Sequence, residues 1–331
     1  MTTKQISIET IAANSSKAMD RIQESIFKTP LLPSMRYGSK LMFKAENFQE
    51  TGSFKIRGAC NMIANLTESE RERGIVAFSS GNHAQGVAAA ARIFKIKATI
   101  VMPSDAPQNK LRNTKEDGAI VILYDRSLGN RVKIAQRIVE ETGAILIPPY
   151  DARDIISGQG TLGIEFVKQI RSLGLADLDY LLAPCSGGGM IAGCAIAFHS
   201  LSPSTLVYAV EPEGFNDTAL SLESGRRMQI QMQKTSLCDA LLLEMPGQNT
   251  FKINKELLSG GLTVTDAETA IAMKTAFHEF KIIVEPSGAV ALAAALTEKL
   301  PFRKKNVGII CSGGNVDLDI FTDMVSKTYS I

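Results

Sequence analysis

The stretch "YLLAPCSGGGMIAGCAIAFHSL", residues 180–201, is typical of a buried strand, a glycine loop and an apolar helix in succession. Three successive glycines, Gly187 to Gly189, let the backbone come close to a ligand. The start of the helix adds unpaired N–H groups and the positive end of the helix dipole, so a phosphate is the ligand to expect. On this stretch alone, a tight turn that only packs the helix on a sheet stays an open alternative.

The same loop also fits a dinucleotide-binding fingerprint. Residues 187–192, "GGGMIA", match the relaxed pattern G-x-G-x-x-A, and Glu211 ends the next predicted strand, where a ribose-binding acid would lie. An NAD-dependent oxidoreductase is therefore a second hypothesis. It leaves Lys55 and the loop "SSGNHA", residues 79–84, without a role.

Around this stretch, short β-rich runs alternate with helical patterns. The runs are rich in Val, Ile and Ala, as expected for strands covered on both faces, and lie at residues 74–82, 97–103, 119–125, 144–151, 204–214 and 306–315. This alternation predicts an α/β fold with parallel or mixed, open twisted sheets and helices on both faces. Ligands bind beyond the carboxyl ends of such strands, where the small-residue loops 79–84, 185–190 and 311–315 fall. Thr265 and Glu268 form a capping-box pattern that predicts a helix start.

The composition of the 331 residues narrows the class of protein. The chain is 45% hydrophobic and 21% charged, with 36 basic against 34 acidic residues, so nothing favours a nucleic-acid partner. The N-terminal residues resemble no signal peptide, and no apolar run is long enough to span a membrane. Five scattered cysteines without a CxxC pair predict reduced thiols in a cytoplasmic protein, and three dispersed histidines argue against a histidine-built metal site.

Lys55 stands out in "TGSFKIRGA", residues 51–59, among small and apolar neighbours at the start of a helical pattern. The positive end of a helix dipole and burial both favour the neutral amine, which is a nucleophile that forms imines with aldehydes. A surface lysine without a special role is the alternative. Such an amine together with a phosphate-binding loop describes a site for pyridoxal phosphate.

At this point the chain resembles the serine/threonine dehydratase group, which includes serine racemases and 3-hydroxyaspartate dehydratases. The resemblance runs from about Thr29 to Asp317 and is carried by "ENFQETGSFKIRGA" (46–59), "SSGNHAQGVA" (79–88), "MPSDAP" (102–107), "PPYDARDIISGQGT" (148–161), "CSGGGMIAG" (185–193), "VEPSGA" (284–289) and "CSGGNVDL" (311–318). It implies the two-domain pyridoxal phosphate fold of the tryptophan-synthase-β type, fold type II. We expect a small domain at 74–151, a large cofactor-binding domain at 1–73 plus 152–331, and a homodimer.

The resemblance also implies roles for the residues that match its motifs. Lys55 would hold the cofactor as a Schiff base and then move the α-proton. Phe54 would pack against the cofactor ring, and Asn82 would bind its 3′-oxygen. Backbone N–H groups would bind the phosphate at Ser186, Gly187, Gly188, Gly189 and Met190. The substrate carboxylate would bind at Ser79, Ser80, Asn82 and His83.

Ser312 would face the pyridine nitrogen. A hydroxyl donates a hydrogen bond to this nitrogen without protonating it, so the ring is a weaker electron sink and expulsion of a β-leaving group competes well with transamination. The implied reaction is dehydration of L-threonine or L-serine to a 2-oxo acid and ammonia, through loss of the α-proton and the β-hydroxide. The alternatives are 3-hydroxyaspartate dehydration and serine racemisation.

Two residues leave the substrate open. Ser80 matches the serine from which racemases return a proton on the face opposite the lysine, or it is one more hydroxyl for the carboxylate. Arg131 matches an arginine that tends to occur in racemases and hydroxyaspartate enzymes, where it could reach a substrate carboxylate. A solvated arginine at a helix start is the other interpretation.

The resemblance further implies a site for Mg²⁺ or Ca²⁺ at Glu211, the carbonyl of Phe215, and Asp217, an all-oxygen set that suits a hard cation. Glu285 lies either near the cofactor ring and lysine or at a helix N-terminus that favours an acid. The stretch "CDALLLEMPGQNT", residues 238–250, departs from the racemase pattern and lowers that alternative. Because the chain ends soon after residue 318, we do not expect feedback through a C-terminal regulatory domain.

Overall fold

The computed structural model describes residues 7–36, 40–231 and 235–327, whose strands form two sheets. The strands are β1 (Leu31–Ser34), β2 (Lys40–Ala45), β3 (Ile75–Phe78), β4 (Ala98–Pro103), β5 (Ile120–Tyr124), β6 (Ile145–Leu146), β7 (Tyr180–Pro184), β8 (Leu206–Pro212), β9 (Gly260–Val264) and β10 (Asn306–Cys311). The larger sheet has the order β1-β2-β10-β7-β8-β9, in which only β1 and β2 pair antiparallel. The smaller sheet has four parallel strands in the order β5-β4-β3-β6.

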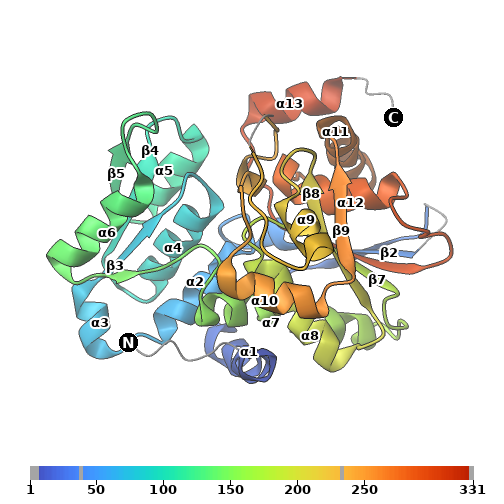
Figure 1. Cartoon of the computed structure of the whole chain (residues 1–331), viewed down its shortest axis with the longest axis horizontal. Helices are drawn as coiled ribbons and strands as arrows, with labels where there is room; N and C mark the ends of the chain where they lie inside the picture. The colour runs from blue at the N-terminus through green and yellow to red at the C-terminus, as the bar shows by residue number, and fades with distance from the viewer. Residues whose placement is uncertain (1–6, 37–39, 232–234, 328–331) are drawn as a thin grey trace.

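Helices connect most of these strands (Figure 1). They are α1 (Ile8–Ile22), α2 (Lys55–Ala64), α3 (Glu68–Arg73), α4 (Asn82–Ile93), α5 (Gln108–Glu116), α6 (Arg131–Thr142), α7 (Arg153–Ser172), α8 (Gly189–Leu201), α9 (Asp217–Ser224), α10 (Gln248–Leu257), α11 (Asp266–Thr275), α12 (Pro286–Leu296) and α13 (Leu318–Ser326), with the short 3₁₀ helices η1 (Glu46–Phe48) and η2 (Asp239–Leu241) and the π-helical segment η3 (Ala276–Phe280). The capping box predicted at Thr265 and Glu268 is confirmed at the start of α11. Across the described residues, every helix is too short or too polar to cross a bilayer.

The large sheet is covered on both faces. On β7, Leu181 and Ala183 pack in one core cluster with Phe166 of α7 and Phe198 of α8. Leu182, which points to the opposite face, packs with residues of α11 and α12. Burial on both faces explains why these strands read as continuous apolar runs in the sequence.

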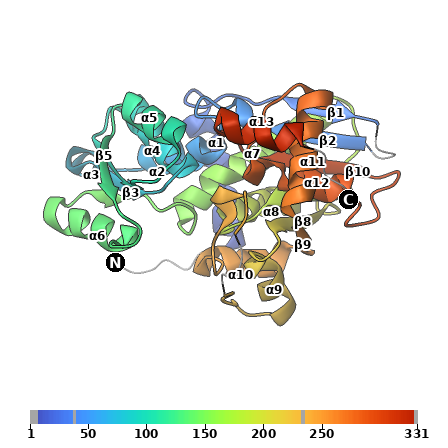
Figure 2. The same cartoon turned by 90° about the horizontal axis from the view of Figure 1, so that it is seen from above.

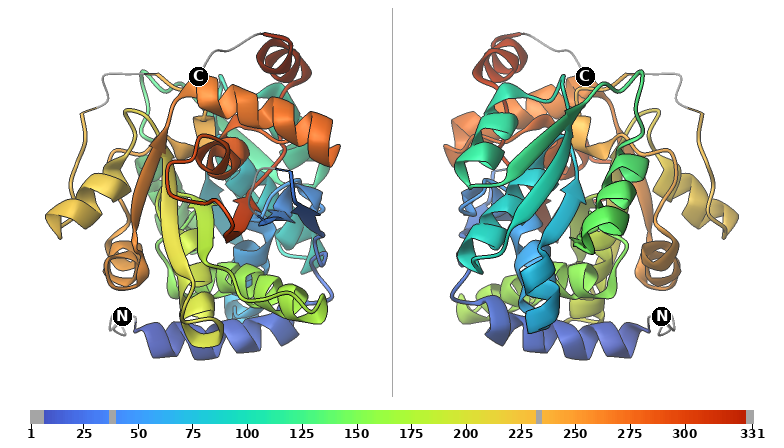
Figure 3. Two further views of the ribbon diagram at one scale, coloured as in Figure 1. Left: turned by 90° about the vertical axis from the view of Figure 1, so that its right-hand side faces the viewer. Right: turned by 90° about the vertical axis from the view of Figure 1, so that its left-hand side faces the viewer.

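The small sheet is built in the same way. Ile75 and Ala77 of β3 share a core cluster with residues of α2 and α4, whereas Val76 packs on the other side with Ala135 of α6. The right-hand view of Figure 3 shows this sheet between helices on both sides. The predicted fold class, α/β with mixed sheets and helices on both faces, is confirmed.

Figure 2 shows β3, β5 and α3 to α6 at one end of the molecule and β1, β2 and β10 at the other. The predicted domain boundaries at residues 74 and 151 stay a prediction, and the ends of the predicted large domain, residues 1–6 and 328–331, lie outside the described residues. Helix α2 precedes Gly74 in the chain, yet its apolar residues Ile56, Ala59 and Ile63 pack in the core cluster of the small sheet.

Candidate active site

A single cavity contains every residue predicted to act in catalysis or to bind cofactor or substrate. Both sheets contribute, through loops at the carboxyl ends of β3, β7 and β10. The predicted residues that line the cavity are Phe54, Lys55, Ser79, Ser80, Asn82, His83, Arg131, Ser186, Gly187, Gly188, Gly189, Met190, Glu285 and Ser312. Glu211, Phe215 and Asp217, predicted to bind a metal, do not line it.

Lys55 is the first residue of α2, as the sequence predicts. Its Nζ donates a hydrogen bond to the backbone carbonyl of Pro149 at 2.8 Å. Burial lowers the pKa of this amine from its ordinary value of 10.5 to about 8. At a pKa of about 8, roughly a tenth of this amine is neutral and nucleophilic at pH 7, far more than for an ordinary lysine.

The glycine loop follows β7 and leads into α8. Gly188 has a φ of +87°, a left-handed conformation that favours glycine. A Cβ on Gly187 would lie 2.3 Å from ring atoms of Tyr150, so the loop passes too close to this ring for any side chain there. The first N–H groups of α8 lack partners within the helix and lie in the cavity wall, which suits an anion.

Backbone hydrogen bonds hold the end of β10 against the loop that precedes Lys55. The Phe54 N–H donates to the Ser312 carbonyl at 3.0 Å, and the Gly314 N–H donates to the Gly52 carbonyl at 2.9 Å. Ser312 and Lys55 therefore belong to one hydrogen-bonded unit, although they are far apart in the chain. This unit places a hydroxyl and an amine in the same cavity.

Glu285 and Asn82 form a polar cluster in the wall of the cavity. The Asn82 side chain donates to Glu285 and accepts from Asn315 at 2.9 Å. Lys110 Nζ lies 3.5 Å from Glu285 and 2.9 Å from Asp239. Burial raises the pKa of Glu285, and the nearby Lys110 charge only partly opposes this effect. Glu285 is also the residue before α12, but its side chain does not cap that helix. Its predicted place near the cofactor ring or the lysine stays a prediction.

Comparison with known proteins identifies the family. Residues 22–313 match the model of the family described as "Pyridoxal-phosphate dependent enzyme". The chain belongs to this family.

Three relatives of this pyridoxal-phosphate-dependent enzyme show which group it is similar to. It is 41% identical to the L-threo-3-hydroxyaspartate ammonia-lyase of Saccharomyces cerevisiae over 93% of this chain and 94% of that protein. It is also 41% identical to the L-threonine ammonia-lyase of Thermotoga maritima, over 88% of this chain and 71% of that protein. The structure of maize serine racemase superimposes with a TM-score of 0.88 at 37% identity, covering 95% of this chain and 96% of that one. The resemblance drawn from the sequence is confirmed.

The residues of the cavity fit pyridoxal phosphate. An amine that burial keeps partly neutral suits the aldehyde, unpaired N–H groups at a glycine loop suit the phosphate, and a hydroxyl suits the ring nitrogen. The alternative of an NAD-dependent oxidoreductase required Glu211 to bind a ribose. This carboxylate is fully buried and accepts the N–H groups of Thr218 and Ala219 at 2.9 and 2.8 Å, so it is not available to a ribose.

His83 and Arg131 differ in the charge that they present to a substrate carboxylate. Burial, followed by the nearby Lys55 charge, lowers the pKa of His83 to about 3, and its Nε2 lies 2.9 Å from the Ile147 carbonyl. His83 is therefore a neutral imidazole near neutral pH and supplies no positive charge to a carboxylate. Arg131, the first residue of α6, reaches the cavity with its guanidinium carbon 5.8 Å from the centre of the Phe78 ring.

The structure adds Lys110, Tyr150 and Asp239 to the lining of the cavity. Burial lowers the pKa of Lys110, but Glu285 and Asp239 outweigh that effect and leave the pKa raised, so the side chain is a cation. The sequence around Lys110 carries no signal for this role, since an exposed lysine on a polar helix reads the same way. Tyr150 lies within the motif at residues 148–161. Its place directly after two prolines in this motif is the feature of the sequence that could have indicated a role in the site.

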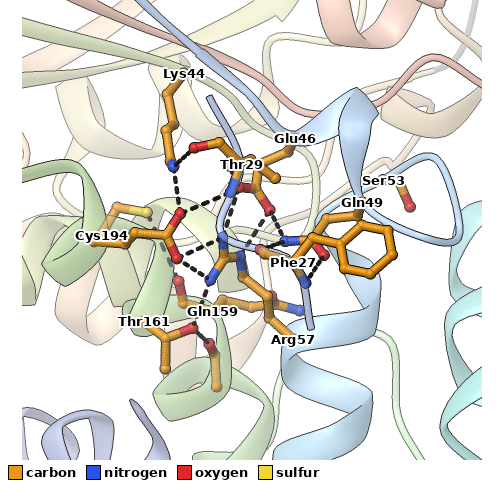
Figure 4. Close-up of polar contacts among 12 residues, drawn as sticks. Phe27, Thr29, Lys44, Glu46, Gln49, Ser53, Arg57, Gln159, Thr161 and Cys194 are labelled. Atoms are coloured by element: carbon orange, nitrogen blue, oxygen red, sulfur yellow. Dashed lines mark hydrogen bonds and ion pairs between the residues drawn. The ribbon is translucent and has the colours of Figure 1, made fainter. Parts of the chain in front are cut away.

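A buried network of charges surrounds Arg57, which lies two residues after Lys55 in α2 (Figure 4). Arg57 donates to Glu46 at 2.7 and 2.8 Å and to Glu165 at 3.2 Å. Lys44 forms an ion pair with Glu165 at 2.5 Å. Two cations thus face two carboxylates, and Thr29, Gln49 and Thr161 complete their hydrogen bonds. The network joins β2, η1, α2 and α7, and so ties the first turn of α2 to the large sheet.

Proposed function

We propose that the protein is a pyridoxal-phosphate-dependent dehydratase that converts a β-hydroxy amino acid, L-threonine or L-serine, into a 2-oxo acid and ammonia. The observation that carries this proposal is the partly neutral Lys55 amine in one cavity with the glycine loop and the Ser312 hydroxyl. The names of the similar ammonia-lyases support the reaction class.

In this proposal, each side chain has a defined task. Lys55 holds the cofactor and moves a proton at the substrate Cα, and Phe54 packs on the ring. Residues 186–190 bind the phosphate through backbone N–H groups. Asn82, held by Glu285 and Asn315, offers a fixed amide to the 3′-oxygen. The loop 79–83, at the N-terminal end of α4, binds the substrate carboxylate.

The bound cofactor withdraws electrons from the substrate Cα. Ser312 limits this effect, because a hydroxyl donates a hydrogen bond to the ring nitrogen but leaves it unprotonated. Ser312 thereby favours loss of the β-hydroxide over transfer of the amino group. The leucine-rich wall at Leu241 and Leu243 contacts the same cavity and is compatible with the methyl group of threonine.

Supplying L-threonine and L-serine separately and measuring 2-oxo acid and ammonia tests this proposal. We expect both products in equal amounts and none from the Lys55→Ala variant. The proposal fails if the cofactor-loaded protein releases no oxo acid from any β-hydroxy amino acid, or if amino-group transfer to the cofactor exceeds oxo acid formation.

L-threo-3-hydroxyaspartate is a second candidate substrate, because Arg131 brings a guanidinium to the cavity. A second carboxylate on the substrate could form a charge-assisted hydrogen bond with this group. The Arg131→Met variant should raise KM for hydroxyaspartate about 10- to 100-fold and leave KM for L-threonine near the parent value. An equal rise in KM for both substrates would show that Arg131 only maintains the shape of the cavity and does not bind the second carboxylate.

Racemisation of serine is a further activity that we propose only as a companion to dehydration. Ser80 and Lys55 both line the cavity, which a two-sided proton exchange at Cα requires. The maize serine racemase superimposes over 95% of this chain. Ala240 and Leu243 belong to the stretch that departs from the racemase pattern, and they too line the cavity.

We also propose that Glu211, Asp217 and the Phe215 carbonyl bind Mg²⁺ or Ca²⁺. Both carboxylates are fully buried, and both oxygens of Asp217 lack a hydrogen-bond partner. Burial raises the pKa of each, and for Glu211 the Asp217 charge adds to this rise. A bound cation would relieve both effects. Within the described ranges, side chains form no group of three or more His, Cys, Asp or Glu that could hold a metal, so a site here depends on the backbone carbonyl.

We propose that two copies of the chain form the predicted homodimer through the surface around Phe48 and Ile283. Both side chains are about half exposed, at 49% each, and the Asn47 side chain joins the two segments by donating to the Ile283 carbonyl at 3.1 Å. Sedimentation of the Phe48→Glu variant should show a shift from dimer to monomer. The predicted cytoplasmic setting stays a prediction, which the five buried, free cysteines support.

A further inference from the structure

Helix α10 lies against the outer side of the glycine loop. Thr250 donates its hydroxyl to the Gly187 carbonyl at 2.6 Å, and Asn254 donates its amide to the Gly188 carbonyl at 3.5 Å. Both side chains are completely buried. They are one helical turn apart and therefore project from the same face of α10.

These contacts determine where the loop's N–H groups point. In a trans peptide, the carbonyl of one residue and the N–H of the next point in opposite directions. Thr250 draws the Gly187 carbonyl towards α10, so the Gly188 N–H points away from α10. Asn254 acts in the same sense on the next peptide, whose Gly188 carbonyl also accepts from Ala192 at 2.9 Å.

The approach of α10 to the loop leaves no space for a side chain at Gly188. A Cβ there would lie 2.6 Å from the Asn254 amide nitrogen and 3.1 Å from the Thr250 hydroxyl. The positive φ of Gly188 adds a second reason for glycine. The glycine loop is therefore shaped from behind by α10 as well as by its own flexibility.

Asp151 holds the start of α10 in place. Its carboxylate accepts the backbone N–H groups of Gln248, Asn249 and Thr250 at 2.9, 2.8 and 3.0 Å. The residue before α10 is Gly247, which has no side chain to cap the helix, so Asp151 supplies the cap from a distant part of the chain. Asp151 directly follows Tyr150, whose ring covers Gly187.

We propose that Thr250, supported by Asn254 and by the Asp151 cap, is a positioning residue that aims the N–H groups of the glycine loop at the cofactor phosphate. The proposal rests on the assignment of this loop to the phosphate under the proposed function. Thr250 itself does not line the cavity. It acts on the phosphate only through the orientation of the Gly187 carbonyl.

The test compares pyridoxal phosphate with pyridoxal, which lacks the phosphate, as ligands of the protein after removal of its cofactor. In Thr250→Val, which keeps the shape but loses the hydroxyl, the Kd for pyridoxal phosphate should rise about tenfold, and that for pyridoxal should not change. The Gly247 N–H, 3.3 Å from the Gly187 carbonyl, prevents a larger loss. Thr250→Ser keeps the donor and should bind both ligands like the parent.

Thr205→Val is the matched control, because Thr205 is also buried and donates to a backbone carbonyl, that of Leu178, at 2.9 Å. It lies just before β8, at the amino ends of the parallel strands, whereas the glycine loop lies at their carboxyl ends. The variant should therefore leave both constants unchanged. The proposal is overturned if Thr250→Val binds pyridoxal phosphate with the Kd of the parent. It is also overturned if the Kd rises equally for pyridoxal phosphate and pyridoxal. A parent that binds pyridoxal as tightly as pyridoxal phosphate refutes the phosphate assignment itself, and the proposal with it.

Discussion

Arg57 donates two hydrogen bonds to the Glu46 carboxylate, at 2.7 and 2.8 Å, and neither side chain is exposed. Arg57 also lies two residues after Lys55, in the first turn of α2. Burial lowers the pKa of the Arg57 guanidinium, but its two carboxylate partners outweigh burial and raise the pKa overall. The residue therefore stays charged, and its charge is balanced within the protein.

Loss of the Arg57 charge should destabilise the protein strongly. Arg57→Met leaves Glu46 and Glu165 with Lys44 as the remaining cation of the network, and we expect a loss of about 3–5 kcal/mol in the free energy of unfolding. Urea unfolding of the cofactor-loaded protein measures this loss. Arg137→Met, which removes an exposed ion pair with Glu141, should change little. Similar effects of the two variants would show that the buried network contributes no more than a surface pair.

Capture of the cofactor should depend on pH through Lys55. Since the pKa of Lys55 is about 8, the neutral amine increases about tenfold per pH unit below this value and levels off above it. The rate at which cofactor-free protein takes up pyridoxal phosphate should follow the same curve between pH 6 and pH 10, as measured by stopped-flow absorbance. A rate that still rises tenfold per unit above pH 9 would indicate an ordinary lysine.

Any D-serine formed from L-serine should depend on Ser80. Replacement of Ser80 by Ala removes the proposed proton donor on the face opposite Lys55, so D-serine should fall below detection, whereas oxo acid formation should stay within about tenfold of the parent. Chiral chromatography and an oxo acid assay on the same samples give both rates. Persistent D-serine formation would show that the Ser80 hydroxyl only assists carboxylate binding.

Mg²⁺ or Ca²⁺ should stabilise the parent through Asp217. A cation at 100 times its Kd would stabilise the folded state by about 2.7 kcal/mol, which should be visible as a rise in Tm. In Asp217→Asn, Tm should no longer respond to the cation. Glu213→Gln alters an exposed acid nearby and should respond like the parent. A parent whose Tm ignores both cations would contradict the proposed metal site.

The parts of the site that the sequence predicts are those encoded locally. Lys55 begins a helix, and the glycine loop follows a strand, so neighbouring residues suffice to recognise them. The apolar runs likewise predict strands covered on both faces. Burial of His83 and its neutral state are not visible locally, because they arise from Ile147 and other residues distant in the chain.

Residues that act across the fold were not recognisable in the sequence. Thr250 and Asp151 are ordinary polar residues until α10 is placed behind the glycine loop. Lys110 reads as a solvated lysine until Glu285 and Asp239 surround it. Predicting such partners requires the positions of elements that are distant in the chain, which periodicity and spacing do not give.

The most direct test is chemical mapping of the lysine that holds the cofactor. Borohydride reduction of the cofactor-loaded protein, followed by digestion and mass spectrometry, should place a pyridoxyl label on Lys55 in near-stoichiometric amount. Lys55→Ala should carry no label, and Lys110→Ala should carry it on Lys55. A label on Lys110 or another lysine, or none in the parent, would contradict the account.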